Sequence, residues 1–166
     1  MSFDWKRLSN LDRAIAGGAG VAFIAGFLPW WGASVGLFSV SVSGWSAGFT
    51  AWAGTLLLTA AGVLLVLRRF GAGLPSVGIG PSVLVAGVSG LGLLLVIIRW
   101  LTLPRYRGIG VGARYGIYLA LIAGIVEVAA AVAQMRASGE EMPWAQQRGE
   151  AVQKESDAGA SAVSEE

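Results

Sequence analysis

Four long apolar stretches are the feature that most constrains the fold of this chain. Each has about twenty residues, and at a rise of roughly 1.5 Å per residue a helix of that length crosses the roughly 30 Å hydrocarbon layer of a bilayer. The stretches are Leu11–Leu28, Gly48–Leu67, Ser82–Leu103 and Gly112–Met135. The sequence therefore predicts an all-α integral membrane protein, in which residues 11–136 form an up-and-down bundle of four transmembrane helices.

The first stretch has one alternative interpretation, a cleaved signal peptide. Basic residues precede it and the small residues 32–34 follow it, as in a leader with its cleavage site. The apolar run is longer than that of a usual leader, however, and it ends in Trp30 and Trp31, which are typical of the membrane interface. We therefore expect a retained membrane helix.

The composition excludes several kinds of chemistry. The 166 residues include no cysteine and no histidine, so thiol nucleophiles, Ser-His triads and Cys/His zinc sites are excluded. Because no apolar stretch contains an acid with a partner base, we expect no enzymatic activity, no cofactor and no metal. The net charge is only +2, and the basic residues lie at the ends of the stretches, so we expect the partner to be the lipid bilayer and not a nucleic acid.

The two flanks differ from the apolar core of the chain. Residues 1–10 interleave aromatic and basic side chains, which predicts an N-terminal segment in the membrane interface, either a short helix or a loosely ordered anchor. Ser9 and Asp12 have the spacing of a capping box, so the first helix is expected to begin there. Residues 137–166 are acidic and rich in Glu, Gln, Ser, Ala and Gly, which predicts a disordered cytoplasmic tail.

The distribution of basic residues predicts a multi-pass protein of the plasma membrane with both termini in the cytoplasm. In that orientation the inner side carries Lys6, Arg7, Arg13, Arg68, Arg69 and Arg136. The outer side carries the smaller set Arg99, Arg105, Arg107 and Arg114. We expect these four arginines, together with Trp30 and Trp31, to contact lipid headgroups or a protein partner.

The first outer loop contains a strand-like segment. Residues 38–43 alternate apolar and hydroxyl side chains, and Gly36 and Gly44 bracket them, which predicts a short β-hairpin over the outer end of the bundle. The edge of such a hairpin either pairs with a partner strand or folds over its own helices. The sequence leaves both alternatives open.

Small residues recur at every fourth position in the apolar stretches. Because helices in lipid associate through close backbone approach, such stripes predict helix–helix contacts. The first stretch offers Ala14, Gly18, Ala22 and Gly26; the second offers Ala47, Ala51, Thr55 and Thr59; the third offers Ala86 and Gly90.

Glu127 is the one acidic residue deep inside an apolar stretch. A carboxylate in that place costs at least a few kcal/mol unless it is protonated, paired or hydrated. One interpretation is functional: Glu127 takes up a proton or binds a cationic group. The other is structural: a neutral Glu127 forms hydrogen bonds with Ser89, Thr59 or a backbone carbonyl and ties helices together.

Several short motifs resemble those of a known group of proteins. They are residues 11–13 (LDR), 28–31 (LPWW), 43–45 (SGW), 99–104 (RWLTLP) and 110–116 (GVGARYG). Over residues 9–139 the chain resembles small four-helix integral membrane proteins of actinobacteria with no assigned activity. The resemblance implies the fold and supplies no mechanism.

Two functions are compatible with these observations. The first is a non-enzymatic assembly or accessory component of the cell envelope, which acts through helix packing and the outer loop in a homo-oligomer or a membrane-protein complex. The alternative is a small proton- or cation-coupled transporter or lipid-handling protein centred on Glu127.

Overall fold

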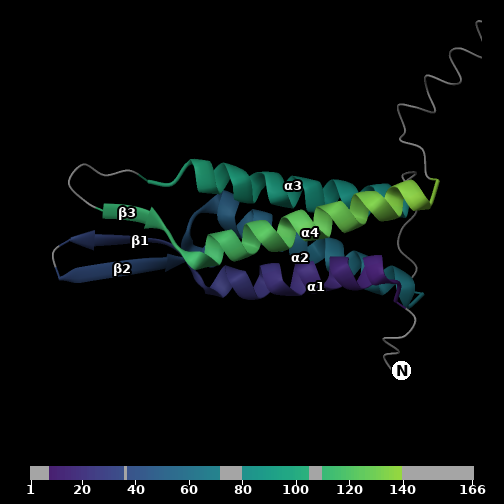
Figure 1. The fold of residues 1–166 in the computed structure, drawn as a ribbon, viewed down its shortest axis with the longest axis horizontal. Helices are drawn as coiled ribbons and strands as arrows, with labels where there is room; N and C mark the ends of the chain where they lie inside the picture. The colour runs from purple at the N-terminus through teal and green to yellow at the C-terminus, as the bar shows by residue number, and fades with distance from the viewer. Residues whose placement is uncertain (1–7, 36, 72–79, 105–109, 140–166) are drawn as a thin grey trace, which may run out of the picture.

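The computed structural model describes residues 8–35, 37–71, 80–104 and 110–139, which form four helices and a three-stranded sheet (Figure 1). The elements are α1 (Asn10–Phe27), β1 (Pro29–Val35), β2 (Phe38–Ser43), the 3-10 turn η2 (Gly44–Ser46), α2 (Phe49–Arg69), α3 (Pro81–Leu101), β3 (Gly110–Ala113) and α4 (Tyr115–Ala137). Each helix lies within a few residues of a predicted apolar stretch. The predicted tail lies outside the described residues except for its first three positions, and the predicted interfacial segment lies outside them up to residue 7.

The four helices form an antiparallel bundle. Each one packs against its two neighbours in the order α1, α2, α3, α4 and back to α1, whereas α2 and α4 hardly touch across the diagonal. α1 and α3 run toward the sheet, which extends beyond one end of the bundle, and α2 and α4 run away from it (Figure 1). We call this end of the bundle the sheet end.

Three of the helices, α2, α3 and α4, are long and apolar enough to cross a membrane. α1, the first of the four predicted spans, is not in this group. It is the shortest helix, with 18 residues, and its first turn contains the polar residues Asn10, Asp12 and Arg13.

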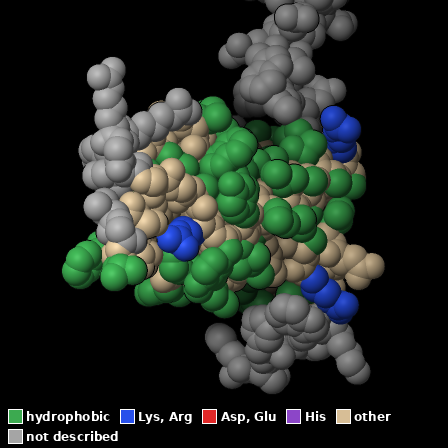
Figure 2. Space-filling view, turned by 60° about the vertical axis from the view of Figure 1, so that its left-hand side comes forward, with side chains coloured by type: hydrophobic (Ala, Val, Ile, Leu, Met, Phe, Trp, Pro, Cys, Tyr) green, Lys and Arg blue, Asp and Glu red, His purple; other side chains and the backbone are tan. Residues whose placement is uncertain are grey.

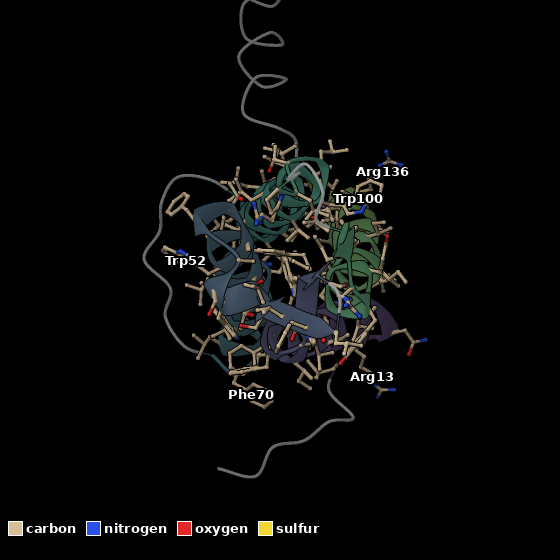
Figure 3. The ribbon with its side chains drawn as sticks, turned by 90° about the vertical axis from the view of Figure 1, so that its left-hand side faces the viewer. Arg13, Trp52, Phe70, Trp100 and Arg136 are labelled. Carbon is tan, nitrogen blue, oxygen red and sulfur yellow. The ribbon has the colours of Figure 1, made fainter. Side chains whose placement is uncertain are left out.

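The flanks of the bundle expose apolar side chains on every helix. Phe27 of α1 is 62% exposed and Ile122 of α4 is 61% exposed. In the space-filling view this surface is mostly green, the few basic side chains are widely separated, and no acidic side chain is visible (Figure 2). Viewed along the bundle from the sheet end, Trp52 and Phe70 lie on its perimeter (Figure 3). An apolar exterior of this kind suits a lipid environment.

Local signals account for the helix starts. Asp12 N donates to Ser9 Oγ at 3.1 Å, and Ser9 N donates to Asp12 Oδ2 at 2.9 Å, so the predicted capping box is confirmed. α3 begins at Pro81, where the missing N–H costs nothing because the first turn has no intrahelical acceptor for it.

Glycines allow the helices to approach closely. Some of these close contacts lie at glycines other than those that the sequence predicts. A Cβ atom on Gly54 of α2 would lie 2.9 Å from Gly92 O of α3, and one on Gly62 would clash with the Cβ of Ala19 in α1. Gly90, which the sequence analysis placed in a packing stripe, has no neighbouring atom within 4 Å of such a Cβ. That prediction is wrong because α3 turns Gly92, and not Gly90, toward α2.

The sheet has the order β2-β1-β3, with β1 antiparallel to both neighbours. The predicted hairpin is confirmed, since β2 pairs with β1 over residues 29–43. The third strand was not predicted: the sequence analysis expected no strand in residues 110–113 and began the last apolar stretch at Gly112. They pair instead with β1, and α4 begins three residues later than predicted, at Tyr115.

The two faces of the sheet differ in chemistry, because residues opposite one another in neighbouring strands point to the same face. The hydroxyl–glycine face is made by the registered sets Ser39, Ser34, Gly110 and Ser41, Gly32, Gly112. The apolar face is made by Val40, Ala33, Val111 and Val42, Trp31, Ala113. The second of these apolar sets packs against the core of the bundle.

Candidate functional site

Glu127 lies near the middle of α4 and its side chain is 0% exposed. It faces α1, since a Cβ atom added to Gly18 would lie 3.0 Å from the Cβ of Glu127 and 3.0 Å from Ala123 O. A larger residue at position 18 would therefore collide with α4. Gly18 gives Glu127 its place in the interface between α1 and α4.

Neither carboxyl oxygen of Glu127 has a hydrogen-bond partner among the described residues. The hydroxyl of Ser89 donates to Ala86 O at 3.3 Å, and the hydroxyl of Thr59 donates to Thr55 O at 2.8 Å. The expected hydrogen bonds from Ser89 or Thr59 to Glu127 are therefore not formed. The physical reason is that Ser and Thr hydroxyls within helices readily bond to a carbonyl one turn earlier.

A groove runs along the seam between α1 and α4 on the outside of the bundle, with a volume of about 340 Å³. Gly17 and Gly18 line it from α1, and Ala123 lines it from α4. Gly18 thus belongs both to the groove wall and to the packing around Glu127. Gly18 has no side chain, so at this position α1 places only backbone between the groove and Glu127.

The predicted small-residue stripe of α1 does not face a single partner. Gly18, Ala22 and Gly26 are buried, whereas Ala14 is half-buried. Gly18 lies against α4, while a Cβ on Gly26 would lie 2.9 Å from the ring of Trp45 near the start of α2. The small residues of the stripe therefore contact different elements along α1, first α4 and then η2.

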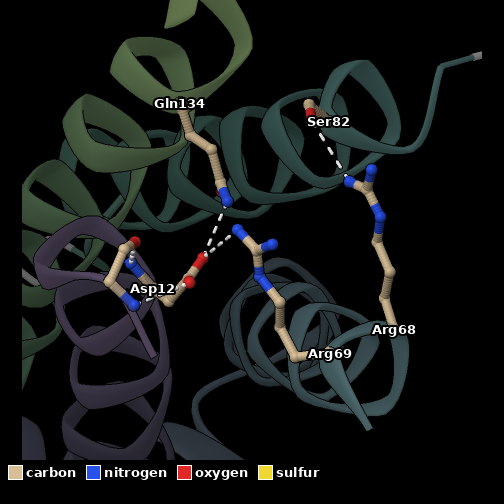
Figure 4. Close-up of polar contacts among 6 residues, drawn as sticks. Asp12, Arg68, Arg69, Ser82 and Gln134 are labelled. Atoms are coloured by element: carbon tan, nitrogen blue, oxygen red, sulfur yellow. Dashed lines mark hydrogen bonds and ion pairs between the residues drawn. The ribbon is translucent and has the colours of Figure 1, made fainter. Parts of the chain in front are cut away.

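The end of the bundle opposite the sheet is held by polar side chains (Figure 4). Asp12 of α1 is 1% exposed, and its Oδ1 accepts hydrogen bonds from Arg69 Nη2 of α2 at 2.9 Å and from Gln134 Nε2 of α4 at 2.7 Å. Arg68 Nη1 donates to Ser82 Oγ at 3.2 Å and so joins α2 to α3. We call this end the network end.

This network was not predicted from the sequence. Asp12 was predicted only to cap a helix, and Arg68 and Arg69 only to set the orientation in the membrane. One signal was available, since a carboxylate in the first turn of an apolar helix needs donors beyond its cap. Nothing in the local pattern points to Gln134, which is 122 residues away.

The aromatic residues predicted at the outer surface have other positions. Trp30 is 0% exposed, and its Nε1 donates to Ala25 O at 2.8 Å inside the bundle. The prediction that Trp30 contacts headgroups or a partner is wrong, because a bulge in β1 turns its ring inward over Gly44. Trp31 is half-buried and packs against the core.

The four predicted outer arginines are only partly described. Arg99 lies in the last turn of α3 and its Nη1 donates to Thr102 O at 3.4 Å. Arg114 is exposed immediately before α4. Arg105 and Arg107 lie outside the described residues. Arg99 and Arg114 belong to the sheet end, as the predicted bundle topology requires.

Comparisons of the chain with protein-family models, curated proteins and solved structures find no match.

Proposed function

We propose that all four helices cross the plasma membrane, with the network end and both termini in the cytoplasm. α1 packs between α2 and α4, so it lies at the same depth as two helices that are apolar enough to span. The acidic residue that lowers its hydropathy, Asp12, is buried in the network and does not face lipid. Beyond its first turn, the exposed part of α1 is apolar, as Ile24 and Phe27 illustrate.

The orientation rests on the positive-inside rule. Arg13, Arg68, Arg69 and Arg136 belong to helix ends at the network end, whereas Arg99 and Arg114 belong to the sheet end. The proposal includes membership of the small four-helix membrane proteins of actinobacteria, which rests on the motifs quoted above.

Within this membrane protein, the function we propose is non-enzymatic: an assembly or accessory component of the cell envelope. The observation that carries it is the apolar tip of the sheet, defined as Leu37, Phe38 and Val40, which are 101%, 82% and 65% exposed. The tip projects beyond the bundle, and β2 is an edge strand of the described sheet. An apolar tip beside an unpaired strand edge suits docking of a second membrane protein or a second copy of the chain.

The test is native mass spectrometry of the full chain purified from its own membrane in mild detergent. We expect a homo-oligomer or a stoichiometric complex for the wild type, and its loss when Leu37→Ser and Phe38→Ser are combined. Phe70→Ser, which changes an apolar side chain at the network end that is 42% exposed, is the matched control and should retain the complex. A monomeric wild type, or a complex that survives the double substitution, would contradict the proposal.

A second candidate function is favoured by the carboxyl group of Glu127, which has no hydrogen-bond partner in the part of the chain that the structure describes. A buried polar group without a hydrogen bond lowers the free energy of unfolding by about 1–3 kcal/mol. Because Glu127 therefore does not stabilise the fold, its presence inside an apolar bundle favours a functional role. In this alternative, Glu127 exchanges a proton or binds a cation during transport.

The alternative is tested by proton flux into proteoliposomes that contain a pH-sensitive dye. Glu127→Gln should abolish flux and leave the fold intact, while Gly87→Ala, at a site with no atom within 4 Å of an added Cβ, should leave flux unchanged. Equal flux through wild type and Glu127→Gln would exclude this function.

A further inference from the structure

A second pocket lies at the base of the hydroxyl–glycine face, where the sheet meets α4. Its volume is about 180 Å³. It is lined by Pro29, Ser39, Val40, Ser41, Arg114 and Tyr115. Its lining includes two serines and an arginine, whereas the groove along α1 and α4 is lined by apolar residues, glycines and Arg13. Its composition is that of a polar binding site and not of a packing defect.

Arg114 is held in this place by the main chain and by a glycine. Arg114 N donates to Trp30 O at 2.8 Å, which fixes the start of α4 against β1. A Cβ on Gly32 would lie 2.8 Å from Arg114 Nε and 3.1 Å from Nη2, so the guanidinium group rests against the strand where a side chain is missing. The absence of a side chain at Gly32 therefore leaves the space that the guanidinium group of Arg114 occupies.

The charge of Arg114 is not balanced by the parts of the chain around it. The sequence contains no Asp or Glu between Asp12, which is at the network end, and Glu127, which is enclosed in the bundle. Among the described residues, none accepts a hydrogen bond from the guanidinium group. A guanidinium group beside hydroxyl donors is an arrangement that binds the oxygens of a phosphate group.

We propose that this pocket binds the phosphate group of an anionic lipid headgroup. Arg114 donates to two phosphate oxygens, and the hydroxyls of Ser39 and Ser41 donate to the others. The lipid source rests on the proposed membrane insertion: Pro29 follows α1 by two residues and Tyr115 begins α4, so the pocket is level with the headgroups of the outer leaflet. Inorganic phosphate offers the same chemistry and is the alternative source that the experiment must separate.

The experiment titrates the full chain in detergent with phosphatidylglycerol, phosphatidylcholine or inorganic phosphate and follows bound ligand by native mass spectrometry. Phosphatidylglycerol should bind with one-to-one stoichiometry and more tightly than phosphatidylcholine. Arg114→Ala should weaken this binding by about tenfold or more, because it removes the charge-assisted hydrogen bonds to the phosphate oxygens. Arg136→Ala, which removes an exposed arginine at the network end, should not change it.

A second variant keeps the result interpretable if Arg114→Ala disturbs the start of α4. Ser39→Ala combined with Ser41→Ala changes only exposed side chains and should weaken phosphatidylglycerol binding by roughly threefold, about 0.7 kcal/mol. Undiminished binding by both variants would overturn the proposal. Inorganic phosphate that binds with the same dependence on Arg114 would overturn the lipid assignment. The Leu37 and Phe38 substitutions leave this pocket intact, so failure of the docking function is a separate result.

Discussion

The two ends of the bundle are closed by different means. At the network end, side chains from all four helices bond to one another, and the buried carboxylate of Asp12 accepts hydrogen bonds from Ser9, Arg69 and Gln134. At the sheet end, backbone pairing joins three strands, while the charge of Arg114 and the apolar side chain of Phe38 are exposed.

This difference indicates that one end of the bundle contributes mainly to stability and that the other end is free to contact other molecules. Polar groups that form hydrogen bonds with one another inside the protein are not available to bind a ligand. Backbone pairing with β1 holds the strands of the sheet together and leaves their side chains and the outer edge of β2 available. The network end therefore holds the helices together, and in the proposed functions the sheet end is the part that contacts lipid and protein partners.

The largest effect is expected at the network end. Asp12→Ala should lower the free energy of unfolding by roughly 3 kcal/mol, because it removes the capping box and the hydrogen bonds to Arg69 and Gln134 together. Thermal unfolding in detergent measures this loss, with Arg136→Ala as a near-neutral control. A loss below about 1 kcal/mol would show that the network contributes little to stability.

A smaller effect is expected where the sheet joins the bundle. Trp30→Phe should cost about 2 kcal/mol, since it removes the hydrogen bond to Ala25 O and leaves unfilled volume in the core. Hydrogen exchange should then increase in β1 before it increases in α2. Trp52→Phe, at a ring that is 38% exposed, is the control, and an equal loss in both variants would refute the role given to Trp30.

The smallest effects concern the glycines between the two ends. Gly54→Ala should destabilise by roughly 1–2 kcal/mol, because its Cβ would meet the backbone oxygen of Gly92 at 2.9 Å. Gly90→Ala has open space and should be neutral or stabilising by about 0.5 kcal/mol, from the better helix propensity of alanine. The same unfolding assay compares the two, and a reversed order would mean that α3 is rotated relative to α2.

Features encoded by local pattern were predictable from the sequence. The apolar stretches located the helices, the spacing of Ser9 and Asp12 located a cap, and the alternation in residues 38–43 located a strand. Each of these signals depends on neighbours within a few residues.

Features that depend on distant partners were not predictable. Residues 110–113 become a strand only because β1 lies beside them, and Asp12 meets Gln134 only when the bundle closes. Trp30 resembles an interfacial residue until a bulge turns it inward. Glu127 was located correctly as a buried acid, but it finds no partner among the described residues, and the hydroxyls of Ser89 and Thr59 bond within their own helices instead.

The pairing of β3 with β1 has a consequence for how the seam between α1 and α4 opens. β1 follows α1 directly and β3 precedes α4 directly, so the strand pairing acts as a hinge at the sheet end. The opposite end of the seam is held by side chains: Gln134 donates to Asp12, and Ile15 of α1 lies in one buried cluster with Ala130 and Ala131 of α4. In the proposed orientation, a motion of α1 away from α4 that is hinged at the strand pairing begins on the cytoplasmic side, and a thiol probe at Gly17→Cys should then react faster from that side than from the other.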